Sequence, residues 1–329
     1  MLSLRSRDTK MKVALLLIVA ILLFPTAMGK INVVVSMPDF ECIVEEIGGI
    51  NASVILPAGA DPHSFSITKD VIDEIKKADL IILANSALLS YEKDIKENYN
   101  KDYLDFEDYE KIELFDFDGF KQNPHGYWLY ANNSVAIAKA IAYKLAEVEP
   151  DKADYYITSF NNFEKRVLEA KKNAIEIAKE NGIYGKKVVA AVPGVCYIAK
   201  NVGMDADKIL FAESVALLNA KEIEEIKEKL EKGEYVGIIV PEFLKEAKVG
   251  EIARQIAYDS NSSVIYVKFA TGGDSYINLF YYNVMQMISL GSKKAVKEEN
   301  NLPLIYLSIS LALLAAFEGF LLYKCRRIK

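Results

Sequence analysis

Short apolar runs alternate with amphipathic stretches along the first half of the chain. Residues 31–35, 52–56 and 80–84 are largely aliphatic, and the segments 40–47 and 68–78 between them show helical spacing. Runs that are apolar at nearly every position indicate strands buried on both faces. Their alternation with helices predicts a parallel sheet, and ligands of such sheets bind beyond the carboxyl ends of the strands.

The same pattern restarts in the second half, after residues 153–180. That stretch holds no glycine or proline and can form one helix of about 40 Å, at roughly 1.5 Å per residue. An ordinary long surface helix is the alternative reading. The later strands and helices are predicted in alternation at 187–191, 219–232, 235–240, 245–258, 263–267 and 275–290.

The predicted fold class is therefore α/β, with two lobes, each a parallel sheet flanked by helices, joined by one long rigid helix. An N-terminal signal and a C-terminal transmembrane helix are predicted in addition. The division is a signal peptide at 1–29, an N-terminal α/β lobe at 30–151, a connecting helix at 152–182, a C-terminal α/β lobe at 183–292, a linker at 293–301, a transmembrane helix at 302–323 and a cytoplasmic tail at 324–329.

The two ends of the chain predict where it resides. Basic residues precede an apolar run at 13–24, and small residues follow up to Gly29, as in a cleaved secretory signal; an uncleaved anchor is the alternative. Residues 302–323 are long and apolar enough to span a bilayer, and basic residues follow them. We therefore expect a single-pass cell-membrane protein with an extracellular body and a cytoplasmic C-terminus. A lipoprotein anchor is not expected, because no cysteine closely follows the first apolar run.

Composition and charge exclude several classes of function. The net charge of -6 without a basic stripe argues against nucleic-acid binding. Three scattered cysteines are too few for a disulfide framework or a CxxC metal site, and they leave open only a single Cys42–Cys196 bridge. The acidic and aromatic stretch 98–121 is predicted to be a solvated surface segment, with attraction of a cation toward His125 as the alternative.

Both histidines of the chain lie in the same local context. They occur in Asp61-Pro62-His63 and Asn123-Pro124-His125. Proline restricts its own backbone and that of the residue before it, so each loop is expected to aim one imidazole at a fixed point. Imidazole is a common metal ligand, which predicts that His63 and His125 form a ligand pair. Two surface histidines that share a context by chance are the alternative.

Several motifs in order carry a family resemblance. They are Gly59-Ala60-Asp61-Pro62-His63-Ser64-Phe65, Ala78-Asp79-Leu80-Ile81-Ile82, Asn123-Pro124-His125 with Trp128-Leu129, Glu149-Pro150, and Gly273-Asp274-Ser275-Tyr276. On the basis of these motifs, roughly residues 31–290 resemble the zinc- and manganese-binding solute-binding proteins of ABC importers. The resemblance implies two α/β lobes bridged by a rigid helix, with metal between them.

The resemblance also implies the metal ligands. It assigns His63 and His125 in the first lobe and Asp274 in the second, where Asp274 could also serve as a helix N-cap. A further family ligand, usually His or Glu, falls on Val192, whose side chain cannot coordinate a metal. Cys196, Glu213 or water could replace it, although Cys196 also reads as a small buried apolar residue.

The implied function is the extracellular solute-binding component of an ABC importer. It would capture a divalent metal ion, zinc or manganese with iron possible, and deliver it as a monomer to the importer's permease and ATPase. The alternative, raised by Val192, is the same fold binding a non-metal solute or serving in adhesion. An enzyme is not expected, because no motif places a general base and no GxSxG or HExxH motif occurs, although two histidines and a carboxylate could activate water or Cys196 could act as a nucleophile.

Overall fold

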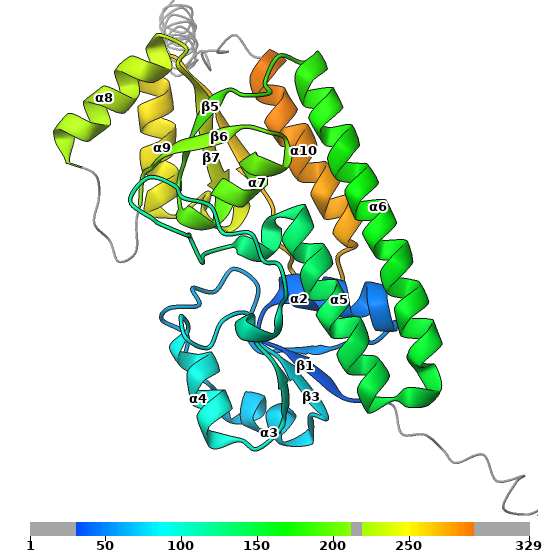
Figure 1. Ribbon diagram of the computed structural model, residues 1–329. Coiled ribbons are helices and arrows are strands. Elements are labelled where there is room, and N and C mark those ends of the chain that lie inside the picture. The colour runs from blue at the N-terminus through cyan, green and yellow to red at the C-terminus, as the bar shows by residue number, and fades with distance from the viewer. Residues whose placement is uncertain (1–30, 212–218, 293–329) are drawn as a thin grey trace, which may run out of the picture. The chain divides into compact units, whose positions relative to one another are not determined.

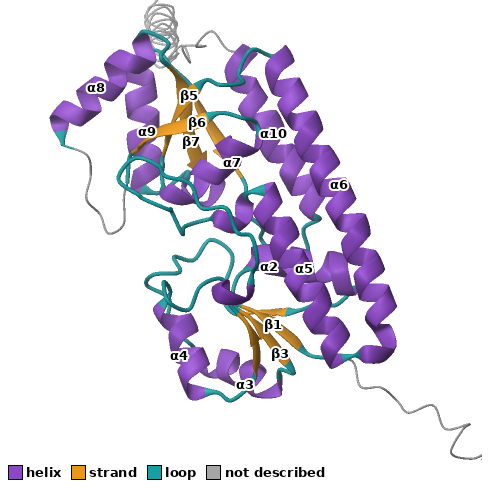
Figure 2. Cartoon of the chain, viewed as in Figure 1, coloured by secondary structure: helices purple, strands orange, loops and turns teal. Residues whose placement is uncertain are grey.

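The structure is a computed structural model that describes residues 31–211 and 219–292. Within these residues the chain forms two four-stranded sheets in which every strand pairing is parallel (Figure 2). The predicted parallel α/β architecture is therefore confirmed. The predicted signal peptide, transmembrane helix and cytoplasmic tail lie outside the described residues.

The first sheet has the strand order β2-β1-β3-β4, and the second has the order β6-β5-β7-β8. Every residue of the two central strands of the first sheet is buried, as their uninterrupted apolar sequences predict. The strands are β1 (Val33–Val35), β2 (Ser53–Val54), β3 (Leu80–Ile82), β4 (Asp102–Leu104), β5 (Lys187–Ala190), β6 (Asp205–Ile209), β7 (Tyr235–Pro241) and β8 (Val264–Val267).

Helices connect the strands (Figure 1). The long helix α6 spans the 28 residues that the absence of glycine and proline predicted. The helices are α2 (Pro38–Gly48), α3 (Lys69–Lys77), α4 (Ser90–Asn98), α5 (Ala131–Val148), α6 (Ala153–Glu180), α7 (Cys196–Asn201), α8 (Ala220–Glu231), α9 (Lys248–Asp259) and α10 (Tyr276–Ser292), with short 3-10 turns at η1 (Phe106–Asp108), η2 (Tyr127–Leu129), η3 (Pro150–Lys152), η4 (Pro193–Val195) and η5 (Glu242–Leu244).

Two strands, β4 and β6, were not predicted from the sequence. Both lie at an edge of their sheet, and both carry polar residues at positions that are not buried. An edge strand that is covered on one side only lacks the continuous apolar run by which the central strands were identified. The pattern therefore identified the strands with continuous apolar runs, including the edge strands β2 and β8, and missed the two edge strands with interrupted runs.

The chain divides into two compact units that are interleaved in sequence. Of the described residues, unit 1 contains 31–113, 131–168 and 269–279. Of the described residues, unit 2 contains 114–130, 169–211, 219–268 and 280–292. The predicted lobes are continuous stretches of chain, whereas each unit combines separate segments. Two of these separate segments, 114–130 and 269–279, carry the predicted metal ligands His125 and Asp274.

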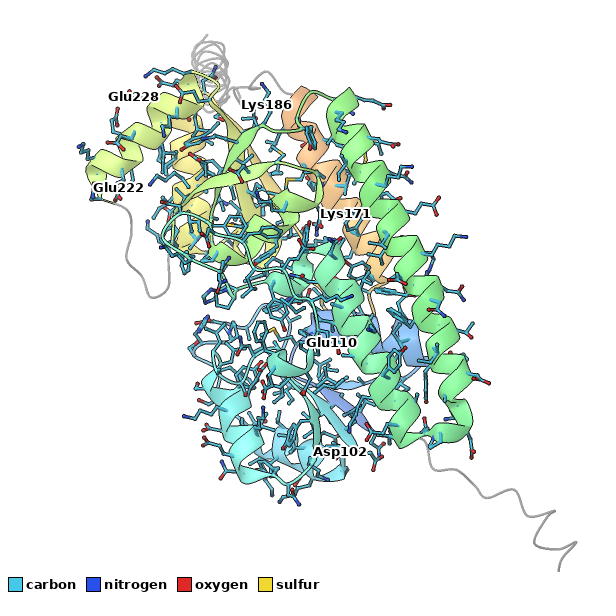
Figure 3. The ribbon with its side chains drawn as sticks, viewed as in Figure 1. Asp102, Glu110, Lys171, Lys186, Glu222 and Glu228 are labelled. Atoms are coloured by element: carbon cyan, nitrogen blue, oxygen red, sulfur yellow. The ribbon has the colours of Figure 1, made fainter. Side chains whose placement is uncertain are left out.

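The first part of the acidic stretch 98–121 lies in unit 1, where exposed carboxylates pair with lysines. Lys139 of α5 lies 3.3 Å from Glu110, and Lys144 of the same helix lies 3.7 Å from Asp102. Figure 3 labels Asp102 and Glu110. Both carboxylates are largely exposed, so each pair contributes about 1 kcal/mol at most. These two carboxylates agree with the predicted solvated surface segment, whereas Asp105 of the same stretch is completely buried and paired with Lys96.

Candidate metal-binding residues

His63 lies in an exposed loop that follows β2, within unit 1. The carboxylate of Asp61 accepts hydrogen bonds from the His63 backbone N–H at 3.0 Å and from the Ser64 hydroxyl at 2.9 Å. These bonds close a tight turn around the proline between Asp61 and His63. The loop thus fixes the backbone of His63 with a side chain from the loop itself, while the imidazole stays exposed.

An aromatic contact connects this loop to the interior of unit 1. Phe65 packs edge-on against the buried ring of Tyr91 with a centroid distance of 5.3 Å. The next residue, Glu92, is fully buried, and its two carboxyl oxygens accept the Ala84 and Asn85 backbone N–H groups at 3.0 and 2.7 Å. Burial raises the pKa of Glu92 from 4.5 to about 7. An ionisable group therefore lies beside an aromatic anchor of the His63 loop.

His125 is held by the side chain of Asn123, which is completely buried. The Asn123 side-chain N–H₂ donates to the Pro193 carbonyl at 3.1 Å, which sets the amide so that its oxygen faces His125. That oxygen accepts the His125 backbone N–H at 3.0 Å and lies 2.9 Å from its Nδ1. Because an amide oxygen can only accept, Nδ1 carries the proton and Nε2 the lone pair that a metal requires.

Further side chains of unit 2 hold the segment around His125. The Tyr197 hydroxyl donates to the Asn123 carbonyl at 2.6 Å and accepts the Phe115 backbone N–H at 3.3 Å. The Asn201 side chain donates to the Leu129 carbonyl at 2.8 Å. Tyr197 and Asn201 belong to α7, more than seventy residues along the chain from the atoms that they bind. These bonds explain why residues 114–130 belong to unit 2.

A close backbone approach adds to this anchoring. Gly126 has a positive φ of 70°, and a Cβ at this position would lie 2.6 Å from the backbone of Gly194. Only glycine fits both the backbone conformation and the space. His125 therefore lies in unit 2, not in the first lobe as predicted, and its loop packs on the segment that contains Val192.

Asp274 lies in the segment 269–279 of unit 1, not in the second lobe as predicted. One oxygen of its carboxylate accepts the Thr271 backbone N–H at 2.7 Å and the Thr271 hydroxyl at 3.0 Å. Helix α10 begins only at Tyr276. The hydrogen bonds of Asp274 thus organise the loop before the helix, which differs from the N-cap reading of its sequence.

The side chain that would replace the ligand at Val192 is not evident among the described residues. Cys196 is completely buried, and burial raises the pKa of its thiol, which disfavours the thiolate that binds metals. Glu213 lies outside the described residues. In the part of the chain that the structure describes, no group of three or more His, Cys, Asp or Glu side chains is arranged to hold a metal ion.

Sequence reasoning missed the supporting role of Asn123 and Tyr197. Asn123 was noted only as the residue before Pro124, and nothing in the sequence singled out Tyr197. The available signal was the repeated Asp/Asn-Pro-His context, because Asp and Asn side chains accept hydrogen bonds from the backbone two residues further on. Both loops use this bond.

Comparison with known proteins identifies relatives of this chain. The family model described as ZnuA, zinc-uptake complex component A, periplasmic, matches residues 33–289. The chain is 26% identical over 293 residues to the metal ABC transporter substrate-binding lipoprotein ScbA of Streptococcus cristatus, covering 82% of this chain and 91% of the relative. It is also 26% identical over 290 residues to the manganese ABC transporter substrate-binding lipoprotein scaA of Streptococcus gordonii, covering 81% and 90%.

Solved structures share the fold. A crystal structure of ZnuA superposes with a TM-score of 0.67 at 18% identity, covering 80% of this chain and 99% of that one. A cadmium-bound periplasmic metal binding protein from Candidatus Liberibacter asiaticus gives a TM-score of 0.64 at 18% identity, covering 80% and 100%. The two-lobed α/β fold predicted from the resemblance is therefore confirmed.

The predicted localisation is contradicted by the same comparison. The relatives are lipoproteins, which are attached to membranes through a covalently bound lipid, and this conflicts with a single-pass C-terminal transmembrane anchor. Within residues 31–211 and 219–292, no helix is both long and apolar enough to cross a membrane. Residues 302–323, on which the prediction rested, lie outside the described residues.

The matched region covers both sheets, both histidine loops and the segment of Asp274. The chain belongs to the ZnuA family of periplasmic zinc-uptake components, as its motifs predicted.

Proposed function

We propose that this protein is the solute-binding component of an ABC importer, that it captures a divalent metal ion, zinc or manganese, and that it delivers the ion to the importer's permease and ATPase. Its family and its relatives, which are named as metal-binding components of such importers, support this function. The observation that carries the proposal is the Asn123–His125 hydrogen bond, because it presents one ring nitrogen of an imidazole as a metal ligand. Iron stays a possible cargo by the chemistry of the donors.

We propose His63, His125 and Asp274 as ligands of this ion. Two neutral imidazoles and a carboxylate suit zinc, manganese and ferrous iron alike. Water or Glu213 completes the coordination in this proposal, since burial raises the pKa of the Cys196 thiol and disfavours the thiolate. Coordination requires neutral imidazoles, so the metal affinity is expected to fall in acid.

A titration of the full-length protein with Zn(II) and Mn(II) tests the function. The variants H63A, H125A and D274N each remove one proposed ligand, and each is expected to weaken binding by about 100-fold or more, beyond the usual effect of a supporting residue. The matched control is D94N, which neutralises an exposed carboxylate on α4. Binding that is unchanged in both histidine variants would refute the metal-binding proposal.

The competing functions receive no support from the structure. The alternative of a non-metal solute or an adhesion role is not favoured, because the relatives are metal-binding components of importers. The ZnuA family is a class of solute-binding proteins, not of enzymes. The monomeric state stays a prediction that sedimentation of the purified protein can test.

A further inference from the structure

The segment that carries Asp274 is bound to the first turn of α2 within unit 1. The Ala270 backbone N–H donates to the Asp39 carboxylate at 3.1 Å, and the Gly273 backbone N–H donates to the Glu41 carboxylate at 3.0 Å. The donors and acceptors are 231 and 232 residues apart in the sequence. In Figure 1 α2 is blue, and α10, which follows the segment, is orange. Two carboxylates from one helical turn thus hold two amides of one loop.

Glu41 occupies a position where an apolar side chain would be expected. It is 3% exposed, and its helix neighbours Phe40 and Cys42 are buried as well. Burial raises the pKa of Glu41 and the nearby carboxylates Glu45 and Asp274 raise it further, while the hydrogen bond from Gly273 lowers it. A buried carboxylate is costly unless it is hydrogen-bonded. Its described hydrogen-bond partner is the loop next to Asp274.

The other side of Asp274 is anchored as well. The Tyr276 hydroxyl donates to the Ser134 hydroxyl of α5 at 2.7 Å, and the Tyr276 ring packs against Phe163 of α6 with a centroid distance of 5.2 Å. All of these groups belong to unit 1. The segment is therefore held at residues 270, 273 and 276, and the carboxylate of Asp274 lies between the last two anchors.

Two glycines give the loop the shape that these bonds require. Gly272 and Gly273 have positive φ values of 101° and 68°, and a Cβ would meet no atom within 4 Å at either position. Glycine is thus required for the backbone conformation and not for lack of space. This left-handed turn presents the Gly273 N–H to Glu41 immediately before Asp274.

We infer that Glu41 and Asp39 are positioning residues for metal binding, which hold the 269–275 segment in place on unit 1 before the metal arrives and so present Asp274 as a pre-ordered ligand. This inference rests on the proposed function of Asp274. A ligand that is already ordered loses less conformational freedom on binding, so the hold increases affinity without contact between Glu41 and the metal. What matters in Glu41 is its hydrogen-bond acceptor and not its charge.

Two variants of Glu41 separate the effect of its hydrogen-bond acceptor from the effect of its charge. E41Q keeps an oxygen that can accept the Gly273 N–H but has no charge, whereas E41A has neither. Zn(II) and Mn(II) affinities are measured on the full-length chain, and hydrogen–deuterium exchange is followed in peptides covering residues 269–276 without metal. E41A is expected to weaken binding by about 10- to 100-fold, in the range of supporting residues of metal sites, and to accelerate exchange of the loop. E41Q should stay close to the wild type in both measurements.

The control is E45A, which removes an exposed carboxylate one turn further along α2. If E41A does not fold, D39A provides the same two measurements, because Asp39 binds the same segment through Ala270. The inference is overturned if E41Q loses as much affinity as E41A, since the charge would then act directly. It is equally overturned if exchange of the metal-free loop does not change in E41A.

These outcomes are separable from failure of the proposed function. If D274N binds metal like the wild type, the ligand assignment is refuted. The exchange measurement in metal-free protein still reports whether Glu41 holds the loop, because it needs no bound ion.

Discussion

The two histidine loops share a sequence motif but are held in different ways. The His63 loop is exposed and is fixed mainly by its own Asp61, with one aromatic contact to the interior of unit 1. The His125 loop is held by the buried Asn123 and by Tyr197, a residue of another helix. Buried hydrogen bonds are worth more than exposed ones and resist local opening. The same Pro-His motif is therefore held by an exposed turn in unit 1 and by buried hydrogen bonds in unit 2.

The largest effect is expected for N123A, which removes the support of the His125 loop. It leaves the Pro193 carbonyl and the His125 N–H without their partner, so the free energy of unfolding should fall by about 2–4 kcal/mol. Metal affinity should fall by about 10- to 100-fold, because the imidazole is no longer oriented. Urea unfolding and metal titration measure both effects, with N98A at an exposed position as the control. Unchanged stability would show that the His125 loop is no more rigid than the His63 loop.

The pH dependence of stability should distinguish the supports of the two loops. The pKa of Glu92, beside the anchor of the His63 loop, is raised from 4.5 to about 7, so the folded state holds this proton more tightly than the unfolded chain. The resulting stabilisation is complete below pH 4.5 and is lost as the pH rises through 7. Between pH 5 and pH 8 the wild type should lose about 2–3 kcal/mol relative to E92Q.

Urea unfolding of both proteins at the two pH values measures this difference. The glutamine side chain can also change the free energy of unfolding by an amount that does not depend on pH. That change is the same at both pH values, so it cancels when they are compared. A difference between the two proteins that stays constant from pH 5 to pH 8 would contradict the raised pKa of Glu92.

A smaller effect is expected for Y197F in the anchoring of the His125 loop. Without the hydroxyl, the Phe115 N–H loses its acceptor and the Asn123 carbonyl loses its donor, which should cost about 1–2 kcal/mol of unfolding free energy. Y258F, at a tyrosine that is 59% exposed, serves as the control and should have no measurable effect. Equal effects of the two changes would show that burial does not strengthen this anchor.

The smallest effect on stability is expected for D61A in the His63 loop. Its hydrogen bonds are exposed, so the free energy of unfolding should change by about 0.5 kcal/mol or less. Amide exchange of residues 61–65 should accelerate, and metal affinity should fall by about 10-fold because the turn around His63 is lost. D61N keeps an acceptor and should behave more like the wild type. A stability loss as large as that of N123A would remove the difference between the loops.

The central strands and the long helix were predictable because they are local patterns. The apolar runs of β1 and β3 and the glycine-free stretch of α6 are visible in the sequence itself. The edge strands β4 and β6 were missed because polar side chains interrupt their apolar pattern. For the site, the sequence identified the candidates His63, His125 and Asp274, but it reversed the units of the last two.

That reversal has a physical cause. Residues 114–130 are flanked in sequence by segments of unit 1, but they hydrogen-bond to unit 2. Residues 269–279 are flanked by segments of unit 2, but they hydrogen-bond to unit 1. The partners that decide this, Tyr197 and Glu41, are 74 and 232 residues away from the residues they bind. No periodicity or spacing along the chain reports on contacts at such separations.

The sequence by itself determined the α/β class, the family and the two Pro-His loops, because each depends on neighbouring residues and on local backbone preference. Only the tertiary structure decided how those loops are held, which ring nitrogen of His125 is left for a metal, and that Glu41 and Asp39 hold the segment of Asp274. These features depend on buried hydrogen bonds between distant segments, and such bonds form only when packing brings their donors and acceptors together.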